Sequence, residues 1–425
     1  MTASIVIKGG RVLDQTGERV ADVVVEGGRI AAIGPDLSGS TTIDAGGCVV
    51  APGLVDVHTH LRQPGREEAE TVQTGGRAAA LGGYTCIVAM PNTEPSIDCA
   101  SVVKDVLLLG RDSACDVRAS AAITVGRAGE RLTEMAELAD LGVRIFTDDG
   151  NGVQDDRLMR RAMEYAGGLG IVLAQHCENE ALSVGGHMHE GEWSSRLGIP
   201  GQPAEAEELM VMRDIALARL TGATVHFQHL STAGSIAMVR AAKDGGMAVS
   251  AEATPHHFTL THAACASYDP VFKVNPPLRT DADVAAVKAG LGDGSLDAIA
   301  TDHAPHAPEL KELPFDQAPP GMLGLETALA LALSELELPL AEVLALLSWR
   351  PAAIAGVTDA HGGLLEPGRP ANLCVIDPNA TWTVDAARLA SKARNTPYDG
   401  RQVRGRVRHT FLRGEPVVLD AEAQV

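Results

Sequence analysis

The sequence predicts an α/β protein in which a parallel (β/α)8 TIM-like barrel is joined to a small β-sandwich formed by both ends of the chain. Three observations support this prediction. The middle of the chain alternates apolar runs with helix-like stretches, both ends are rich in short strand-like runs, and polar residues follow nearly every apolar run of the middle. Parallel strands need helical crossovers, so eight alternating units predict a barrel.

The composite sandwich is expected to consist of residues 1–51 and 362–425. Short strand-like runs separated by paired glycines dominate both segments, which indicates that they build one domain together. The runs are Ser4–Ile7, Asp22–Val25, Ile30–Ile33, Thr41–Ile43, Asn372–Ile376, Trp382–Val384 and Thr410–Leu412.

Residues 52–361 are expected to form the catalytic barrel. Its predicted strands are Gly53–Val57, Thr85–Met90, Arg118–Ile123, Val143–Thr147, Val172–Gln175, Val225–Gln228, Ala248–Ala251 and Ala298–Ala300. Helix-like stretches between them include Glu67–Leu81, Ser101–Leu109, Glu130–Leu141, Arg157–Leu169, Glu205–Leu220 and Ile236–Lys243. Catalytic residues of such barrels lie at the carboxyl ends of the strands.

Composition narrows the class of function. The 425 residues carry a formal net charge of −20, which argues against nucleic acid and anionic membranes as partners. An anionic substrate would therefore need a local positive site. Seven cysteines without a Cys-x-x-Cys pair indicate reduced thiols, and no apolar run approaches the length of a membrane span, so we expect a cytoplasmic protein.

Two motifs predict a metal centre. His58 and His60 are two positions apart on a predicted strand, so their imidazoles point the same way. Asp302, at the end of the eighth strand, adds a carboxylate, and His176 and His229 end the fifth and sixth strands. A nitrogen-rich cage with a carboxylate base is typical of hydrolytic metal sites.

Other histidines and a cysteine compete for these roles. His226 faces away from His229 on the same strand, and Cys177 faces away from His176, so both are expected to be structural. A structural or supporting role is also expected for the pair His256 and His257. The remaining histidines are expected to lie at the surface or in loops: His187, His189, His262, His361 and His409.

The bridge between two metal ions must be a carboxylate in this chain. Some barrels of this kind use a carbamylated lysine on the fourth strand, but no lysine occurs between Lys104 and Lys243. Asp148 and Asp149 end the fourth strand, and adjacent residues cannot both point inward. The residues alone leave open which of the two serves.

Five motifs together resemble the dihydroorotase family of the amidohydrolase superfamily, in particular its long-chain bacterial class with an aspartate bridge. The resemblance covers essentially the whole chain. The motifs are His58-x-His60-x-Arg62, Met90-Pro91-Asn92-Thr93, Thr147-Asp148-Asp149-Gly150, Val274-Asn275-Pro276-Pro277-Leu278-Arg279 and Thr301-Asp302-His303-Ala304-Pro305-His306. It implies reversible cyclisation of N-carbamoyl-L-aspartate to (S)-dihydroorotate plus water, the third step of pyrimidine synthesis.

The same resemblance implies roles for individual residues. Two Zn²⁺ ions per chain would be bridged by Asp149 and a hydroxide, with Asp302 as the catalytic acid and base. His58, His60 and Asp302 would hold one ion, and His176 with His229 the other. The implied substrate-binding residues are His60, Arg62, Asn92, Asn275, His306, Pro320 and Gly321. Pro320-Gly321 stands where the family often has Phe-Gly, and this is the one visible departure from the family's motifs.

Arg62 can supply the local positive charge that an anionic substrate needs in this acidic protein. Its planar guanidinium group can bind the α-carboxylate of the substrate through two hydrogen bonds. Residues 305–323 are interpreted either as a lid over the substrate or as a plain connection.

Two other functions are compatible with the fold. A hydantoinase or allantoinase would act on related cyclic amides, but the missing lysine and the presence of Arg62 count against both. An inactive structural subunit of a transcarbamoylase assembly should have lost ligands, whereas the full set is present here. A homodimer, or an assembly with aspartate transcarbamoylase, remains open.

Overall fold

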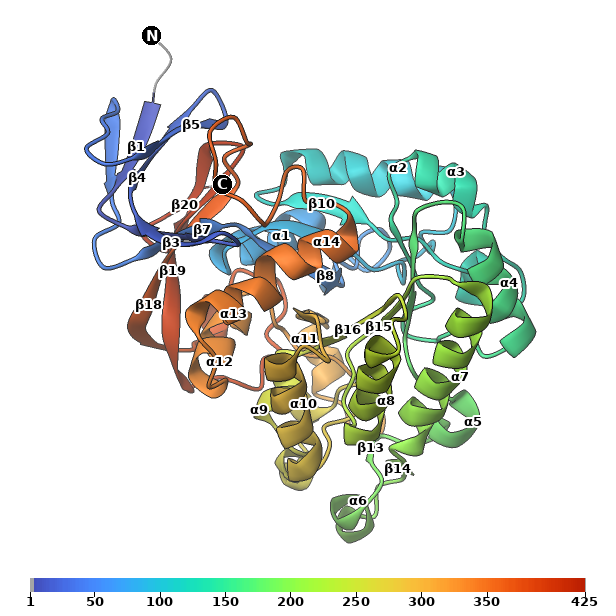
Figure 1. The fold of residues 1–425 in the computed structure, drawn as a ribbon. Coiled ribbons are helices and arrows are strands. Elements are labelled where there is room, and N and C mark those ends of the chain that lie inside the picture. The colour runs from blue at the N-terminus through green and yellow to red at the C-terminus, as the bar shows by residue number, and fades with distance from the viewer. Residues whose placement is uncertain (1–3, 425) are drawn as a thin grey trace.

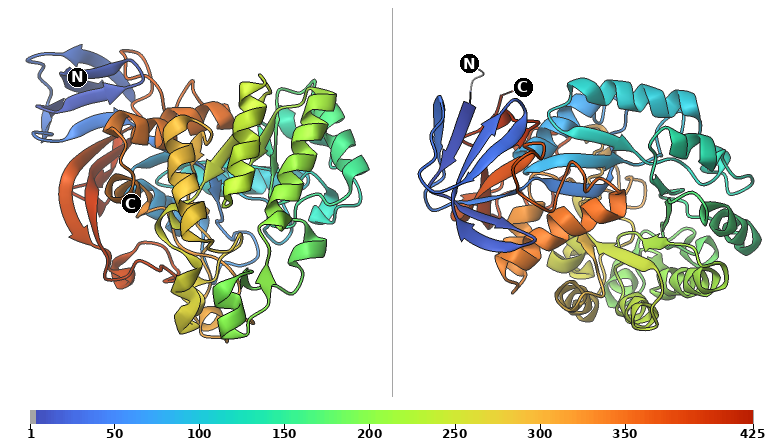
Figure 2. Two further views of the ribbon diagram at one scale, coloured as in Figure 1. Left: turned by 60° about the horizontal axis from the view of Figure 1, so that its bottom comes forward. Right: turned by 45° about the horizontal axis from the view of Figure 1, so that its top comes forward.

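The computed structural model describes residues 4–424; residues 1–3 and 425 of the predicted sandwich lie outside the described part. A barrel surrounded by helices forms the larger part of the molecule, and a β-sandwich lies to one side of it (Figure 1). Both ends of the described chain lie in the sandwich (Figures 1 and 2). The predicted fold class is thereby confirmed, whereas the domain boundaries at residues 51/52 and 361/362 stay a prediction.

The sandwich consists of two sheets. The smaller has the order β5-β4-β1-β6 and the larger the order β21-β20-β19-β18-β7-β2-β3. The ends of the chain meet where β7 pairs antiparallel with β18, with Pro52 opposite Leu373. Buried residues of both sheets, among them Ile7, Val23 and Phe411, form the core between them. The strands are β1 (Ser4–Lys8), β2 (Arg11–Asp14), β3 (Gly17–Val20), β4 (Asp22–Glu26), β5 (Arg29–Gly34), β6 (Thr41–Asp44), β7 (Val49–Pro52), β18 (Leu373–Thr383), β19 (Gln402–Leu412), β20 (Glu415–Leu419) and β21 (Glu422–Ala423).

Several of these strands were not expected from sequence. Strand β19 begins at Gln402, eight residues before the predicted run, because its first half alternates exposed arginines with buried Val403 and Val407. The first half of β19 is apolar only at every second residue. It therefore contains no continuous apolar run that would predict a strand. The two predicted runs at 372–376 and 382–384 form the single strand β18, which continues through a register irregularity between Asp377 and Thr381.

The eight barrel strands are confirmed. All ladders between neighbouring barrel strands are parallel, in the orders β10-β9-β8 and β11-β12-β15-β16-β17. Two isolated parallel bridges, Ala121 to Phe146 and Thr59 to His303, connect these sheets into a closed ring. The strands are β8 (Leu54–Thr59), β9 (Tyr84–Ala89), β10 (Asp116–Ala119), β11 (Ile145–Phe146), β12 (Val172–Gln175), β15 (Val225–Phe227), β16 (Val249–Ala253) and β17 (Ala298–Ile299).

Helices cover the outside of the barrel (Figure 2). Helix α1 begins at Val72, not near Glu67, because Thr71 caps it with its side chain and residues before the cap are not helical. The helices outside the loops are α1 (Val72–Leu81), α2 (Ala100–Leu109), α3 (Met135–Asp140), α4 (Asp156–Ala166), α7 (Glu205–Thr221), α8 (Ala233–Asp244), α10 (Asp281–Asp293), α12 (Ala328–Glu335), α13 (Leu340–Leu344) and α14 (Arg350–Ala355). Short elements in the loops are α5 (Glu180–Ser183), α6 (Glu192–Leu197), α9 (Pro255–Thr259), α11 (Pro308–Lys311), β13 (Met188–His189) and β14 (Gly201–Gln202).

The prediction that the remaining histidines lie at the surface or in loops is wrong for His189 and His409, which are buried in β13 and β19. His361 lies in a loop as expected, but it is buried as well. His361 lies between Asp116 Oδ2, at 2.9 Å, and Thr85 Oγ1, at 3.1 Å. These partners are more than 240 residues away along the chain, so no local sequence pattern predicts that His361 is buried. No helix within residues 4–424 is long and apolar enough to cross a membrane.

Candidate metal centre

The residues predicted as ligands come together at the carboxyl ends of the barrel strands. They come from five different strands or from the loops that follow them, and every one is buried. His229 and Asp302 adopt positive φ values of 35° and 43°, which is uncommon for residues other than glycine and occurs preferentially at functional sites. The converging residues are His58, His60, Asp149, His176, His229 and Asp302.

Asp149 lies at the centre of four imidazoles. Its Oδ1 is 3.4 Å from His58 Nε2, 3.3 Å from His176 Nδ1 and 3.6 Å from His229 Nε2. Its Oδ2 is 3.6 Å from His60 Nε2. Burial alone would raise the pKa of Asp149, but His58 and the surrounding hydrogen bonds hold it well below the usual value.

Asp148 points elsewhere. Its carboxylate accepts hydrogen bonds from the backbone N–H of Thr124, at 2.9 Å, and from the Thr124 hydroxyl. The choice between Asp148 and Asp149, which the residues left open, is therefore a matter of backbone direction at the end of β11. Only Asp149 faces the imidazoles.

Asp302 faces the histidine pair of the first strand. Its Oδ1 is 2.9 Å from His60 Nε2 and 3.6 Å from His58 Nε2. Burial raises the pKa of Asp302, and the neighbouring imidazoles, above all His58, lower it below its usual value by more. The carboxylate is thus held in its ionised form.

The donor set fits divalent cations. Two compact groups of ligand atoms share one imidazole: His58, Asp149 and His229, and His58, His60 and Asp302. Within residues 4–424, the buried His58 Nε2 and His229 Nδ1 have no hydrogen-bond partner. Burial by itself would lower the pKa of His58, yet the surrounding carboxylates, Asp149 first among them, raise it well above its usual value. The cluster therefore favours positive charge and presents the imidazole and carboxylate donors that transition metals prefer.

His176 lies at the margin of this cluster. Its Nδ1 is 2.8 Å from His229 Nε2, while its Nε2 is 3.1 Å from Glu178 Oε2. Burial raises the pKa of Glu178, but the hydrogen bond from His176 lowers it to about 2. Sequence reasoning missed Glu178, although its position two residues after His176 at a strand end was a signal that could have revealed it.

Glu252 is a second missed residue. This fully buried carboxylate on β16 accepts from His58 Nδ1 at 2.7 Å and from His226 Nε2 at 2.9 Å. A carboxylate that receives the second N–H of a metal-binding imidazole fixes its orientation and raises its basicity. His226 thus has the structural role expected for it, through Glu252.

We expect Glu252→Gln to weaken metal binding by about 10–100-fold, because the His58 imidazole loses the anionic acceptor that orients it. The measurement is a zinc titration of metal-free protein in competition with a chromogenic chelator. Glu207→Gln is the matched control, since Glu207 is equally buried but accepts from Ser231 and Thr232 instead of an imidazole. Equal zinc affinities in the two variants would contradict the orienting role of Glu252.

Arg62 lies beside the cluster and is buried. Its Nε donates to the carbonyl oxygen of Pro305 at 3.0 Å, and burial lowers its pKa to about 10. In the described chain, no carboxylate oxygen lies within 4.0 Å of its guanidinium nitrogens. A buried cation without a counter-ion is costly, so this position favours an anionic ligand.

The other predicted substrate residues surround the same space. Asn92 Oδ1 accepts from His60 Nδ1 at 2.8 Å, which orients this imidazole. Asn275 donates to Glu178, and its buried Oδ1 has no partner among the described residues. His306 Nε2 donates to the carbonyl oxygen of Pro320 at 2.8 Å.

Gly321 is conformationally required. Its φ of +147° and the 2.7 Å that would separate an added Cβ from His306 Nε2 exclude larger residues. Its N–H donates to the carbonyl oxygen of Lys273 at 2.9 Å, so this group is already used within the protein. The Pro320-Gly321 turn packs against His306.

The remaining candidates behave as structural groups. The Cys177 thiol is buried in the core and donates to the carbonyl oxygen of Gln175. His257 lies between Thr254 Oγ1 and the carbonyl oxygen of Pro276, and burial lowers its pKa to about 3. His256 is buried beside it, and its Nε2 has no partner within the described chain.

Comparison with solved structures identifies the class. The fold matches the L-hydantoinase (dihydropyrimidinase) from Arthrobacter aurescens with a TM-score of 0.88 and 26% identity, covering 100% of this chain and 98% of the other. It matches the dihydropyrimidinase from Brevibacillus agri with a TM-score of 0.87 and 25% identity, covering 99% and 96%. Residues 284–418 also match the model described as Amidohydrolase family. The chain is an amidohydrolase, a member of a metal-dependent superfamily of hydrolases.

Sequence relatives identify the family within this class. Residues 47–235 match the model described as Dihydro-orotase-like. The chain is 48% identical to the dihydroorotase of Pelotomaculum thermopropionicum over 98% of this chain and 99% of the relative. It is 48% identical to the dihydroorotase of Mycobacterium tuberculosis, with 99% of both chains covered. The chain belongs to the dihydroorotase family.

Proposed function

We propose that this chain catalyses the reversible cyclisation of N-carbamoyl-L-aspartate to (S)-dihydroorotate and water. One observation carries the proposal. Arg62, a buried cation without a carboxylate partner in the described chain, lies beside a cluster of imidazoles and carboxylates that fits divalent metal ions. Such a site can bind an anionic substrate and hydrolyse a cyclic amide within the same space.

The proposed ligands for two Zn²⁺ ions are His58, His60 and Asp302 on one side and His176 and His229 on the other, with Asp149 between them. Bound metal ions would acidify a water molecule and polarise the amide carbonyl of the substrate. The finding of two compact donor groups around Asp149 and Asp302 supports this assignment. The identity and number of the ions are part of the proposal.

Asp302 is the proposed catalytic acid and base. During hydrolysis, its carboxylate takes a proton from the attacking water and delivers it to the leaving ring nitrogen. During synthesis, the same carboxylate takes the proton from the ureido nitrogen of carbamoyl aspartate and delivers it to the oxygen that leaves the side-chain carboxylate. One further proton from solvent completes the water molecule. Its lowered pKa supports this role, because the group starts each hydrolytic turnover as a base.

The remaining residues bind and orient the substrate. Arg62 pairs with the α-carboxylate, and Asn92, Asn275 and His306 are placed to hydrogen-bond to the same ligand. The unpaired Oδ1 of Asn275 supports its inclusion, because a buried acceptor without a partner is costly unless a ligand supplies a donor. The carbonyl oxygens of Pro320 and Gly321 complete the proposed contacts, because the N–H of Gly321 is bonded to Lys273.

Turnover of related ring amides tests the proposal. We expect hydrolysis of dihydroorotate by the metal-loaded protein to exceed that of hydantoin and allantoin by orders of magnitude in kcat/KM. The solved structures of similar fold are named hydantoinases and dihydropyrimidinases, so these rings are the appropriate competitors. Preference for hydantoin would overturn the proposed substrate but not the amidohydrolase chemistry.

Replacing Arg62 separates carboxylate recognition from ring chemistry. Arg62→Met leaves the substrate carboxylate without its partner, which costs about 2–5 kcal/mol, or roughly 30- to several-thousand-fold in kcat/KM for dihydroorotate. Any activity on dihydrouracil, the same ring without the carboxylate, should be almost unchanged. The measurement is kcat/KM for both compounds in wild type and variant at equal zinc content. A parallel loss for both rings would mean that Arg62 only supports the site's structure.

Location and assembly belong to the same proposal. The seven cysteines are all unpaired, which supports a cytoplasmic location. A homodimer or an assembly with aspartate transcarbamoylase stays a prediction, testable by light scattering of the purified chain with and without the transcarbamoylase. The role of residues 305–323 as a lid over the substrate also stays a prediction. Within this segment, Lys311 donates a hydrogen bond to the carbonyl oxygen of Pro319.

A further inference from the structure

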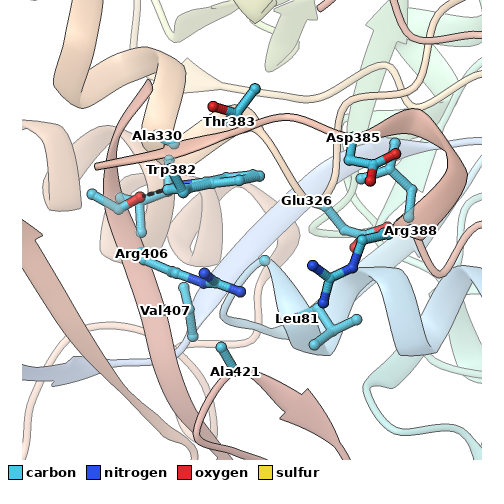
Figure 3. Close-up of a pocket in the computed structure, with 14 residues that line it drawn as sticks. Leu81, Glu326, Ala330, Trp382, Thr383, Asp385, Arg388, Arg406, Val407 and Ala421 are labelled. Atoms are coloured by element: carbon cyan, nitrogen blue, oxygen red, sulfur yellow. Dashed lines mark hydrogen bonds between the residues drawn. The ribbon is translucent and has the colours of Figure 1, made fainter. Parts of the chain in front are cut away.

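A pocket of about 300 Å³ lies between the barrel and the large sheet of the sandwich. Its walls come from the end of α1, the start of α12, the strands β18 and β19, and the loop that joins these strands (Figure 3). None of its lining residues belongs to the metal centre or to the proposed substrate site. The volume lies at the lower end of the range typical of small-molecule sites.

Two guanidinium groups reach into this pocket. Figure 3 shows Arg388 and Arg406 extending toward each other from different elements, below the ring of Trp382. Among the residues the structure describes, neither has a carboxylate oxygen within 4.0 Å, although many other surface arginines do. Both side chains are exposed, and Asp377 is the cross-strand neighbour of Arg406 without forming an ion pair with it. Two guanidinium groups that extend toward each other with no carboxylate oxygen within 4.0 Å favour an anion between them.

The acidic residues of the pocket are engaged with the backbone. Asp385 accepts from the N–H of Ala387, and Glu326 accepts from the N–H of Ala390 at 2.8 Å. Burial raises the pKa of Glu326 to about 7, so about half of this carboxyl is protonated near neutral pH. Neither side chain cancels the positive charge of the arginines through an ion pair.

The pocket also offers a fixed aromatic surface. The indole N–H of Trp382 donates to the carbonyl oxygen of Gly405 at 2.9 Å, which holds the ring in place. The Arg406 guanidinium lies 5.7 Å from the ring centroid. Leu81, Leu329 and Val407 add apolar surface. Rigid aromatic and apolar walls with a few convergent polar groups favour a ligand that has a flat organic part as well as a charge.

We propose that this pocket binds a small phosphate monoester that carries a planar ring, at a site separate from the catalytic centre. A phosphate dianion has the charge and the number of oxygens to accept from both guanidinium forks, whereas one carboxylate can satisfy only one fork fully. The ring would lie against the apolar wall beside Trp382. This inference does not depend on the proposed function.

Calorimetric titration of the full-length protein with phenyl phosphate, inorganic phosphate and phenol tests the proposal. We expect phenyl phosphate to bind once per chain and more tightly than inorganic phosphate, and phenol to give no saturable heat. Arg388→Gln and Arg406→Gln should each weaken phenyl phosphate binding about tenfold, the size of one lost hydrogen-bonded charge contact. Thermal unfolding of each variant checks that the fold is retained.

Two further variants make the test specific. Arg404→Gln removes the same charge from the same strand outside the pocket and should leave the affinity unchanged. Arg62→Gln removes the cation of the catalytic site and should also leave it unchanged. Loss of binding in Arg62→Gln, unchanged binding in both pocket variants, or no saturable binding at millimolar phenyl phosphate would overturn the proposal. Equal affinity for inorganic phosphate would overturn the part that concerns the ring.

Discussion

Asp302→Asn is expected to lower kcat for dihydroorotate hydrolysis by orders of magnitude while KM changes little. The amide of asparagine has the shape of the carboxylate but cannot take a proton from water, and general acid–base catalysis typically contributes about 10²–10⁴-fold. Asp302 is buried, and the neighbouring imidazoles hold its pKa below its usual value, so the carboxylate is ionised and can accept a proton near neutral pH.

The measurement is steady-state hydrolysis with metal content determined on the same samples. His60 is the nearest imidazole, at 2.9 Å from Asp302, so the exchange could also loosen a ligand. Equal metal content in wild type and variant therefore has to be shown before kcat is compared. A near-normal kcat with full metal occupancy would remove Asp302 from the proton transfer.

Asp149→Ala should abolish activity and lower bound zinc from about two ions per chain. Its carboxylate is the only one in the described chain that lies within 3.6 Å of all four imidazoles of the cluster. Without the Asp149 carboxylate, the four histidines share no anionic partner. Two metal ions bound close together would then repel each other without a negative charge between them. Zinc analysis by mass spectrometry after dialysis gives the number of ions retained.

Asp148→Ala is the matched control, because it removes the neighbouring carboxylate of the same loop. Asp148 is bonded to Thr124 and faces away from the cluster, so the change should reduce thermal stability more than metal content. If the Asp149 variant kept its full metal content, or if the Asp148 variant lost more zinc, the assignment of the bridge would be reversed.

The barrel and the cluster of predicted ligands could both be predicted from the sequence. The alternation of strand and helix patterns predicted the barrel, because a parallel strand must be followed by a crossover of its own. The polar residues at strand ends predicted the ligand cluster, because the carboxyl ends of barrel strands meet at one face. His58 and His60 needed only the two-residue period of a strand, and the motif around Asp302 needed only its place after the last strand.

Tertiary structure decided what depends on direction and on distant partners. Asp148 and Asp149 are equivalent in sequence, and only the path of the backbone after β11 turns one of them toward the imidazoles. Glu252 orients His58 across 194 positions of the chain, a pairing that no local period encodes. The pocket of Arg388 and Arg406 exists only because β18 and β19 lie against α1 and α12, far from them in sequence. The spacing of residues along a strand or helix determines on which face of that element a side chain lies. The partners that the side chain contacts there depend on how elements from distant parts of the sequence pack together.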